Sequence, residues 1–235
     1  MKILRSHRLA LTVLLLLTCA VPAVAREGAD PAINQPYLDP DFALWVKRFE
    51  SSGREVYDQR AAIVAASGAK PGMRVADIGA GTGLFTLLFA HVVGPTGHVT
   101  AVDISPTFAT NIQRRAQNEK LGNVSTRVNT QTDTGLPPAS IDLAFVSDTY
   151  HHFEQPRAML ASIHRALRAG GSLIVIDFER VEGKSTAWVL GHVRADKKQV
   201  IREIEATGFR LAADTGLLKE NFYLRFERST TDSRK

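Results

Sequence analysis

The sequence predicts one α/β domain: a doubly wound, mostly parallel seven-stranded sheet with an antiparallel hairpin at its C-terminal end. The first observation is that short apolar runs alternate with helix-like segments between residues 74 and 208, a pattern typical of parallel sheets covered by helices. The second is composition. The 235 residues are 44% hydrophobic and 23% charged, values typical of a globular domain and not of a disordered or multispan membrane protein.

Helices are expected where apolar residues recur at helical spacing between capping signals. Proline suits the first turn of the segment that begins at Pro106, and Gly208 is an end signal for the segment before it. The expected helices are 41–50, 54–67, 82–93, 106–118, 156–167 and 196–207.

Strands are expected where short apolar runs lie between turn residues. The runs 141–147 and 173–178 are nearly all apolar, which favours strands buried on both faces of a sheet. Seven residues join the last two runs, which predicts the terminal hairpin. The expected strands are 74–78, 98–103, 124–128, 141–147, 173–178, 209–213 and 221–227.

The first 25 residues have the three parts of a secretory signal peptide. Lys2, Arg5 and Arg8 form a basic start, Leu9–Val21 an apolar core, and Ala23-Val24-Ala25 a small-residue cleavage motif. We therefore expect a protein exported to a bacterial periplasm or secreted. An uncleaved membrane anchor is the alternative.

Cysteine and charge exclude several classes of function. Cys19 is the one cysteine of the chain and lies inside the expected signal peptide, so a mature chain has no disulfide, catalytic thiolate or thiolate metal site. A lipoprotein attached through Cys19 would need a small residue just before it, and Thr18 is not the usual one. The net charge of +5 includes the three basic residues of the signal segment, which leaves the rest near neutrality, without a footprint for nucleic acid.

The chain therefore divides into four expected parts. They are the signal peptide 1–25, an N-terminal linker and short helix 26–53, the α/β domain 54–228 and a flexible tail 229–235. Proline, aspartate and asparagine are frequent in 26–40, which indicates an exposed linker there.

The strongest motif is a glycine loop, Gly79-x-Gly81-x-Gly83, between an expected strand and an expected helix. Gly79 and Gly81 let the backbone approach a ligand, and Gly83 permits close packing of the helix. The spacing differs from the G-x-G-x-x-G of dinucleotide sites. Asp77, beside the loop, repels phosphates but can pair with an amino group, and Asp103 ends the next strand, where a carboxylate can accept both hydroxyls of a ribose. The ligand described is a nucleoside with a cationic amino-acid tail.

The chain resembles the class I S-adenosylmethionine-dependent methyltransferases over residues 54–228. Asp77–Gly83 looks like their first motif and Val102–Ser105 like their second, and the spacing to Leu136-Pro137-Pro138 and Leu167–Gly171 also matches. The resemblance is greatest to small-molecule methyltransferases of the ubiquinone/menaquinone and arsenite-methylating kind. It implies S-adenosyl-L-methionine as cofactor and a small-molecule methyl acceptor.

The resemblance also implies which residues bind the cofactor. The methionine end would lie on the loop formed by Gly79, Ala80, Gly81 and Gly83, the ribose on Asp103 and the adenine against Ile104. Asp148, at the end of the fourth strand, would accept a hydrogen bond from the methionine amine.

Thr132 and Asp133 fall where such enzymes contact the adenine amino group. The local sequence Gln131-Thr132-Asp133-Thr134 departs from the usual Asp followed by an apolar or small residue. A turn role for Asp133, close to Gly135, is therefore the alternative.

The segment after the fourth strand, Tyr150-His151-His152, supplies the catalytic candidates. In this fold it faces the transferred methyl group, and histidine titrates near neutrality, so one of the two could deprotonate an acceptor while Tyr150 helps to place it. A packing or capping role for one histidine is the alternative. We expect no metal, because neighbouring strand positions point to opposite faces and no third ligand is near in the sequence.

Further candidates have solvated or capping roles as alternatives. Asp177 could face the substrate or cap a loop. His192 and Arg194 lie in a segment that related enzymes use as a lid or substrate wall, and they are candidate substrate contacts. Tyr57 and Arg60 could face the cofactor carboxylate from the helix that begins at Arg54.

Together these features predict a methyltransferase that acts on a small molecule. An exported S-adenosylmethionine-binding protein without turnover is one alternative, because the cofactor is made in the cytoplasm. A membrane-attached enzyme that acts on a lipid or quinone is another, if the N-terminal segment stays uncleaved.

Overall fold

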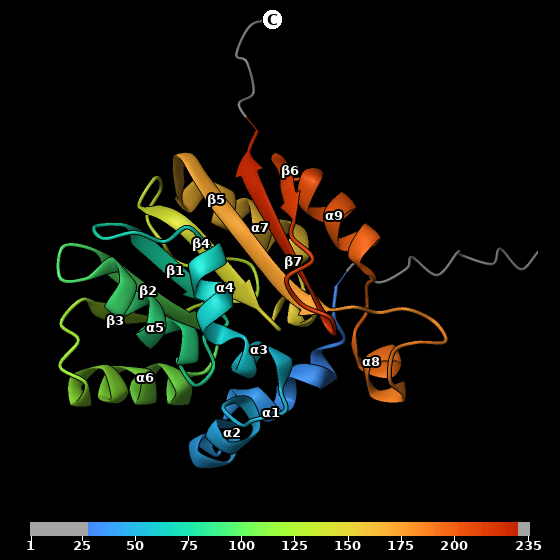
Figure 1. Ribbon diagram of the computed structural model, residues 1–235, viewed down its shortest axis with the longest axis horizontal. Helices are drawn as coiled ribbons and strands as arrows, with labels where there is room; N and C mark the ends of the chain where they lie inside the picture. The colour runs from blue at the N-terminus through green and yellow to red at the C-terminus, as the bar shows by residue number, and fades with distance from the viewer. Residues whose placement is uncertain (1–27, 230–235) are drawn as a thin grey trace, which may run out of the picture.

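A computed structural model describes residues 28–229; the expected signal peptide and Cys19 lie outside this part. The chain forms a seven-stranded sheet in the order β3-β2-β1-β4-β5-β7-β6 (Figure 1). Strands β1 to β5 pair in parallel, and β7 runs antiparallel to both β5 and β6. The strands are β1 Arg74–Ile78, β2 His98–Asp103, β3 Val124–Val128, β4 Ile141–Ser147, β5 Leu167–Phe178, β6 Phe209–Asp214 and β7 Asn221–Arg228. The predicted fold class is confirmed.

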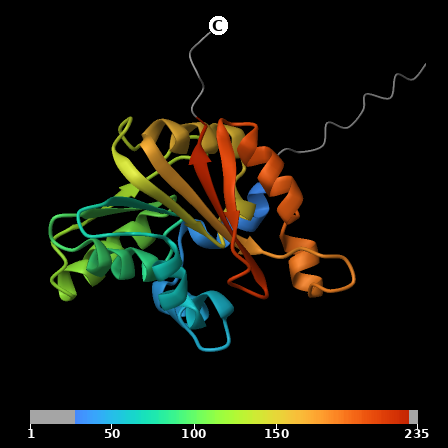
Figure 2. The ribbon, with the colours of Figure 1, turned by 45° about the horizontal axis from the view of Figure 1, so that its top comes forward.

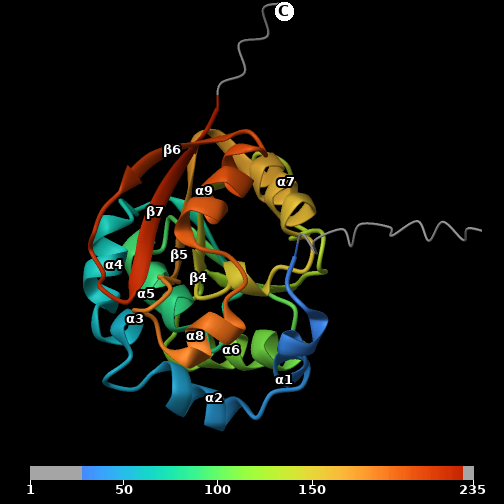
Figure 3. The ribbon, with the colours of Figure 1, turned by 90° about the vertical axis from the view of Figure 1, so that its right-hand side faces the viewer.

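Helices cover both faces of the sheet and close two apolar cores, one on each face. In Figure 3, α4 and α5 lie on one side of the sheet and α7 and α9 on the other. The helices that cover the sheet are α3 Glu55–Asp58, α4 Arg60–Ala66, α5 Leu84–Val93, α6 Pro106–Asn118, α7 Pro156–Ala166 and α9 Lys197–Glu205. Between residues 28 and 229, no helix has the length and apolar character needed to cross a membrane.

Alternation along the strands builds these two cores. Val75 of β1 and Phe145 of β4 point into the core under α5, whereas Ala76 and Val146, one position later in each strand, point into the core under α7. Successive side chains of a strand point to opposite faces, so strands covered on both faces are apolar throughout. This explains the nearly unbroken apolar runs in the sequence.

The strand order reverses beside β1, which has β2 on one side and β4 on the other. Loops from neighbouring strands therefore leave in opposite directions at this point and open a crevice at the carboxyl ends of the strands. The β6–β7 hairpin lies at the far edge, beyond β5 (Figure 2).

The N-terminal segment is folded, not the exposed linker predicted over 26–40. A 3₁₀ turn, η1 Pro31–Asn34, leads into α1 Gln35–Leu38, and α2 Phe42–Phe49 follows. Aspartates cap two of these elements, since Asp30 accepts from the Ala32 N–H and Asp41 from the Leu44 N–H, as N-cap residues do. These helices lie at the same end of the sheet as α8 Ala187–His192 (Figure 1).

Three other local differences bear on the site. The helix expected over 54–67 is divided at Gln59 into α3 and α4. Glu55 in α3 accepts hydrogen bonds from the backbone N–H groups of 219–221, which ties α3 to the start of β7. Tyr150–His152 forms a 3₁₀ turn, η2, rather than an extension of β4, and residues 187–192 form the short helix α8.

Candidate active site

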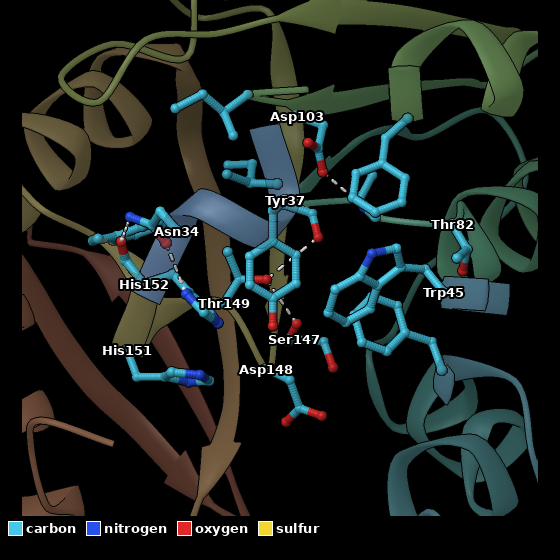
Figure 4. Close-up of a pocket in the computed structure, with 18 of the residues that line it drawn as sticks. Asn34, Tyr37, Trp45, Thr82, Asp103, Ser147, Asp148, Thr149, His151 and His152 are labelled. Atoms are coloured by element: carbon cyan, nitrogen blue, oxygen red, sulfur yellow. Dashed lines mark hydrogen bonds between the residues drawn. The ribbon is translucent and has the colours of Figure 1, made fainter. Parts of the chain in front are cut away.

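A cavity of about 610 Å³ opens at the carboxyl ends of β1, β2 and β4, a volume within the range of small-molecule sites. The glycine loop and Asp103 line one end, and three histidines line the other. Figure 4 shows Tyr37 and Trp45, from the N-terminal helices, between Asp103 on one side and Asp148 and the histidines on the other.

The glycine loop needs its glycines for two different reasons. Gly79, Gly81 and Gly83 all have positive φ, at 69°, 54° and 86°, a region that side chains rarely adopt. A Cβ on Gly79 would also lie 2.1 Å from Cγ2 of Thr149, and one on Gly83 2.9 Å from Cγ1 of Ile112. At Gly81 the nearest atom to such a Cβ would be Cε2 of Phe49, at 3.3 Å across the cavity wall. Gly79 and Gly83 thus permit close packing, and Gly81 leaves room for a ligand.

Asp103 lies at the end of β2 and is 6% exposed. One carboxylate oxygen accepts the Gly81 N–H at 2.8 Å and the other the Ser105 N–H at 2.9 Å. Burial raises the pKa of Asp103 to about 6. Each carboxylate oxygen keeps a further lone pair, so Asp103 can accept hydroxyls of a ligand in the cavity. Ile104 and Phe108 line the wall beside it.

Asp77 lies beneath the loop, where the Thr86 hydroxyl donates to its carboxylate at 2.6 Å. Burial raises the pKa of Asp77 to about 7. A buried carboxylate of this kind gains from a nearby cation, and Asp77 lines the cavity. Its position suits an amino group of a ligand.

Asp148 is already bonded to two other side chains of the protein. It pairs with the Arg54 guanidinium and accepts from the Asn221 amide at 2.6 Å. Arg54 itself lines the cavity and supplies a cation there. Tyr57 and Arg60 do not line it; the Arg60 guanidinium lies over the Tyr57 ring, 4.2 Å from its centroid. Arg54 and Arg48 are thus cations that line the cavity, whereas Arg60 does not contact it.

Thr132 and Asp133 are not on the cavity wall, which corrects their predicted contact with adenine. Asp133 accepts from the Gly135 N–H at 2.7 Å and from Arg165 at 2.6 Å, and these bonds lower its pKa. It holds a turn, the alternative role. Asn129 and Gln131 line the cavity instead.

Tyr150 points away from the cavity, which corrects its predicted catalytic role. Its ring is fully buried in the core under α7 and α9, and its hydroxyl donates to Glu203 at 2.7 Å. Burial raises the pKa of the Tyr150 hydroxyl above its ordinary value. Arg194 pairs with Glu203 at 2.7 Å and lies over the Tyr150 ring. Arg194 is thus part of the same structural cluster and is not at the cavity.

Both histidines of η2 line the cavity, and Figure 4 shows the hydrogen bond between His152 and Asn34. The ring of His151 is anchored as well. Nδ1 of His151 lies 2.7 Å from Asp177, whose second oxygen accepts the His151 backbone N–H at 2.9 Å. Asp177 is 1% exposed, so it positions His151 and does not face a substrate. Nδ1 of His152 lies 2.8 Å from Oδ1 of Asn34. Burial, His151 and His192 lower the pKa of His152 to about 2.

His192, from α8, joins this pair. Its ring centroid lies 5.2 Å from that of His151 and 5.3 Å from that of His152, and Trp188 stacks on its outer side at 4.6 Å. The segment was predicted to be a lid or a substrate wall, but the meeting of three histidines was not predicted. Spacing along the chain gives no signal for it, because η2 and α8 are about 40 residues apart.

An aromatic wall from the N-terminal helices completes the cavity. Tyr37 and Trp45 lie 4.5 Å apart, Trp45 and Phe49 4.9 Å, and Tyr37 and His152 4.9 Å between ring centroids. Asn34 and Tyr37 were not expected at the site, because proline and aspartate indicated a linker there. The spacing of Trp45 and Phe49 on one side of a short helix was the available signal.

Comparison with known proteins agrees with this geometry. Residues 76–175 match a family model described as a methyltransferase domain. The ubiquinone/menaquinone biosynthesis C-methyltransferase UbiE of Shewanella piezotolerans is 30% identical over 119 residues, which are 50% of this chain and 47% of that protein. UbiE of Vibrio campbellii is 34% identical over 116 residues, 48% of this chain and 44% of that one. The chain thus matches about half the length of these curated relatives.

Solved structures share the fold. A SAM-dependent methyltransferase from Aquifex aeolicus has a TM-score of 0.69 at 22% identity, covering 78% of this chain and 96% of that one. An S-adenosylmethionine-dependent methyltransferase from Mesorhizobium loti has a TM-score of 0.60 at 16% identity, covering 75% and 99%.

Proposed function

Because residues 76–175 match a methyltransferase-domain family model, we propose that this chain transfers the methyl group of S-adenosylmethionine to a small-molecule acceptor. The observation that carries the proposal is that one continuous cavity holds two kinds of lining. The glycine loop and Asp103 line one end, which suits a nucleoside, and histidines and aromatic rings line the rest. A methyltransferase needs both, because two molecules must meet in one site.

The residues at the first end fit the cofactor. Asp103 has acceptor capacity for a ribose, and Ile104 and Phe108 give an apolar wall for a base. Asp77 and Arg54 offer one negative and one positive group beside the loop, which matches the amino and carboxylate groups of a methionine tail. When bound, S-adenosylmethionine supplies a methyl group already activated on a sulfonium. The protein then has mainly to hold the acceptor in line with it.

The histidine and aromatic lining supports an acceptor that carries a flat, largely apolar ring. Tyr37, Trp45, Phe178 and Trp188 line the cavity, and aromatic pairs favour stacked or edge-to-face contacts with such rings. The histidine nitrogens are the polar groups that would orient a hydroxyl or another donor atom on that ring. The quinone C-methyltransferases among the relatives are consistent with this class of acceptor.

We also propose that the enzyme works outside the cytoplasm. Support comes from the basic, apolar and small-residue parts of residues 1–25, which have the order of a cleaved export signal. This segment lies outside the described residues, so its cleavage is a matter for measurement.

The proposal is tested with the purified full chain, S-adenosylmethionine labelled in its methyl group, and a panel of hydroxylated aromatic and quinol acceptors. We expect label in at least one acceptor, with equal production of S-adenosylhomocysteine. Binding of the cofactor without transfer to any acceptor would support the non-catalytic alternative. Absence of cofactor binding by a folded chain would contradict both.

A further inference from the structure

We propose that His151, His152 and His192 bind a divalent transition-metal ion, with zinc the best match, at the acceptor end of the cavity. One ligand nitrogen from each residue can be chosen so that all three atoms lie within 4.8 Å of one another. Two of the rings come from η2 and the third from α8. The two reasons for expecting no metal therefore fail: a 3₁₀ turn does not alternate its side chains like a strand, and the third ligand comes from a distant segment.

The hydrogen bonds around His151 and His152 leave the right nitrogens free. The Asp177 carboxylate accepts only, so Nδ1 of His151, 2.7 Å away, carries the proton. The Asn34 amide donates to the His152 carbonyl and to Glu154. Its oxygen is therefore the atom that faces Nδ1 of His152, which must also be protonated. Nε2 of each ring thus has a lone pair, the state in which imidazole binds metal.

His192 has a buried ring nitrogen that lacks a partner in the described part of the chain. Its Nε2 is buried without a hydrogen-bond partner in the described structure, and leaving such a group unpaired is costly. The ring is held in place by Trp188 stacked at 4.6 Å, and the end of α8 is held by Arg180, which donates to the carbonyls of Leu190 and Val193. A metal ion would give this nitrogen the partner that it lacks.

Asp177 and Asn34 hold the Nδ1 atoms of His151 and His152, as the hydrogen-bond partners of metal-binding histidines do. Metal-binding histidines typically donate their other ring N–H to a carboxylate or carbonyl oxygen, which fixes the tautomer and the orientation of the ring. Here the carboxylate is 1% exposed and the amide belongs to a residue that is 7% exposed. The arrangement is built into the core and is not a chance gathering of surface histidines.

The donor set indicates the metal. Three imidazoles suit Zn²⁺ and other late first-row ions, whereas Mg²⁺ and Ca²⁺ prefer oxygen ligands. With Zn–N bonds of about 2.0–2.1 Å, tetrahedral ligands lie about 3.3 Å apart, so ring movements of about 1 Å close the site. Three protein ligands leave a fourth position, which is typical of catalytic rather than structural zinc.

The fourth position would take a donor atom of the acceptor, since all three histidines line the cavity. This part of the inference rests on the proposed function. A hydroxyl bound to the metal loses its proton more readily than a free one. The ion would lower the pKa of the acceptor hydroxyl, and the proton would pass to solvent, so that no histidine base is needed. The metal site itself can be tested without cofactor or acceptor.

The test is Zn²⁺ binding by the full chain without a histidine tag, measured by elemental analysis after dialysis and by competition with a chromophoric chelator. We expect one Zn²⁺ per chain. His192→Ala and His192→Phe should each weaken binding at least 10-fold, and Phe keeps the stacking on Trp188. Asn34→Leu should weaken it by about 10–100-fold, the usual effect of losing the group behind a ligand. His91→Ala is the matched control, because His91 is exposed and does not line the cavity.

A second measurement reports the coordination geometry of the bound metal. Co²⁺ in place of Zn²⁺ should give the strong visible absorption of a four-coordinate site, and His192→Ala should abolish it. No Zn²⁺ bound by the folded wild-type chain, or unchanged affinity in both His192 variants, would overturn the proposal. If the chain binds no Zn²⁺ and His151→Ala still loses methyl transfer, the histidines act in proton transfer and the metal proposal is wrong. Cofactor affinity, measured separately by calorimetry, distinguishes failure of the metal site from failure of the proposed function.

Discussion

Asp177 holds His151 through both of its carboxylate oxygens, one 2.7 Å from the ring Nδ1 and the other 2.9 Å from the backbone nitrogen. The two contacts fix the position of η2 and the tautomer of the ring together. Asp177 is buried under the turn and does not line the cavity, so its effect on chemistry passes through His151.

Asp177→Asn should therefore lower methyl transfer by about 10–100-fold, a range typical of residues behind a functional ligand. An amide has only one acceptor oxygen and cannot replace both contacts. Nitrogen-15 chemical shifts of the imidazoles should report a changed tautomer of His151. Asp214→Asn, an exposed substitution in the pair with Lys197, is the control. An unchanged tautomer and rate in Asp177→Asn would contradict the positioning role.

Gly79→Ala should destabilise the chain, because the residue has φ 69° and its new Cβ would lie 2.1 Å from Thr149. Backbone strain alone costs about 1–2 kcal/mol, and the clash adds to it. Gly122→Ala is the matched control, since nothing lies within 4 Å of a Cβ there. Urea denaturation measures both. Equal free energies of unfolding for the two variants would show that the loop does not need this glycine.

The contribution of Asp77 to stability should fall as pH rises between about 4 and 7 in the ligand-free chain. Burial raises the pKa of Asp77 from 3.8 to about 7, so the folded state holds a proton that the unfolded state releases. The stabilising proton is fully present below the unfolded pKa and is lost as pH rises through the folded one. Asp77→Asn should flatten this dependence by roughly 4 kcal/mol, at about 1.4 kcal/mol for each pKa unit. Urea denaturation at pH 4 and pH 8 is the measurement, and identical pH dependence in both proteins would be evidence against a buried, proton-binding Asp77.

Tyr150→Phe should leave methyl transfer unchanged while lowering the free energy of unfolding. The lost hydrogen bond to Glu203 is worth about 1.5–3 kcal/mol, as for bonds to charged groups. Thermal denaturation and initial rates at saturating cofactor separate the two effects. A rate loss of 100-fold or more in a folded variant would show that Tyr150 takes part in catalysis after all.

The mature N-terminus in the native host should be Arg26, because Ala23-Val24-Ala25 supplies the small residues of a cleavage site. Intact-mass measurement of the soluble protein decides this. A soluble protein that retains residues 1–25 would contradict the signal-peptide interpretation.

The sequence was sufficient to predict the strands and the glycine loop, because both are local. Strand β4 lies at 141–147 as expected, because a short unbroken apolar run is compatible with few structures other than a buried strand. Asp103 could be placed from the end of the next strand. Contacts across the chain were out of reach: Asn34 and His152 meet although 118 residues separate them. Tyr150 was misplaced because a 3₁₀ turn, not a strand, sets the directions of residues 150–152.

The most direct test of the central claim is calorimetric titration of the full chain with S-adenosylmethionine, compared between Asp103→Ala and Asp133→Ala. We expect one binding site in the wild type. Asp103→Ala should weaken it by about 10–150-fold, which corresponds to roughly 1.5–3 kcal/mol for hydrogen bonds to a charged group. Asp133→Ala should bind as the wild type does, because Asp133 is a turn residue away from the cavity. Unchanged affinity in a folded Asp103→Ala, or no binding by the wild type, would contradict the assignment of this cavity to the cofactor.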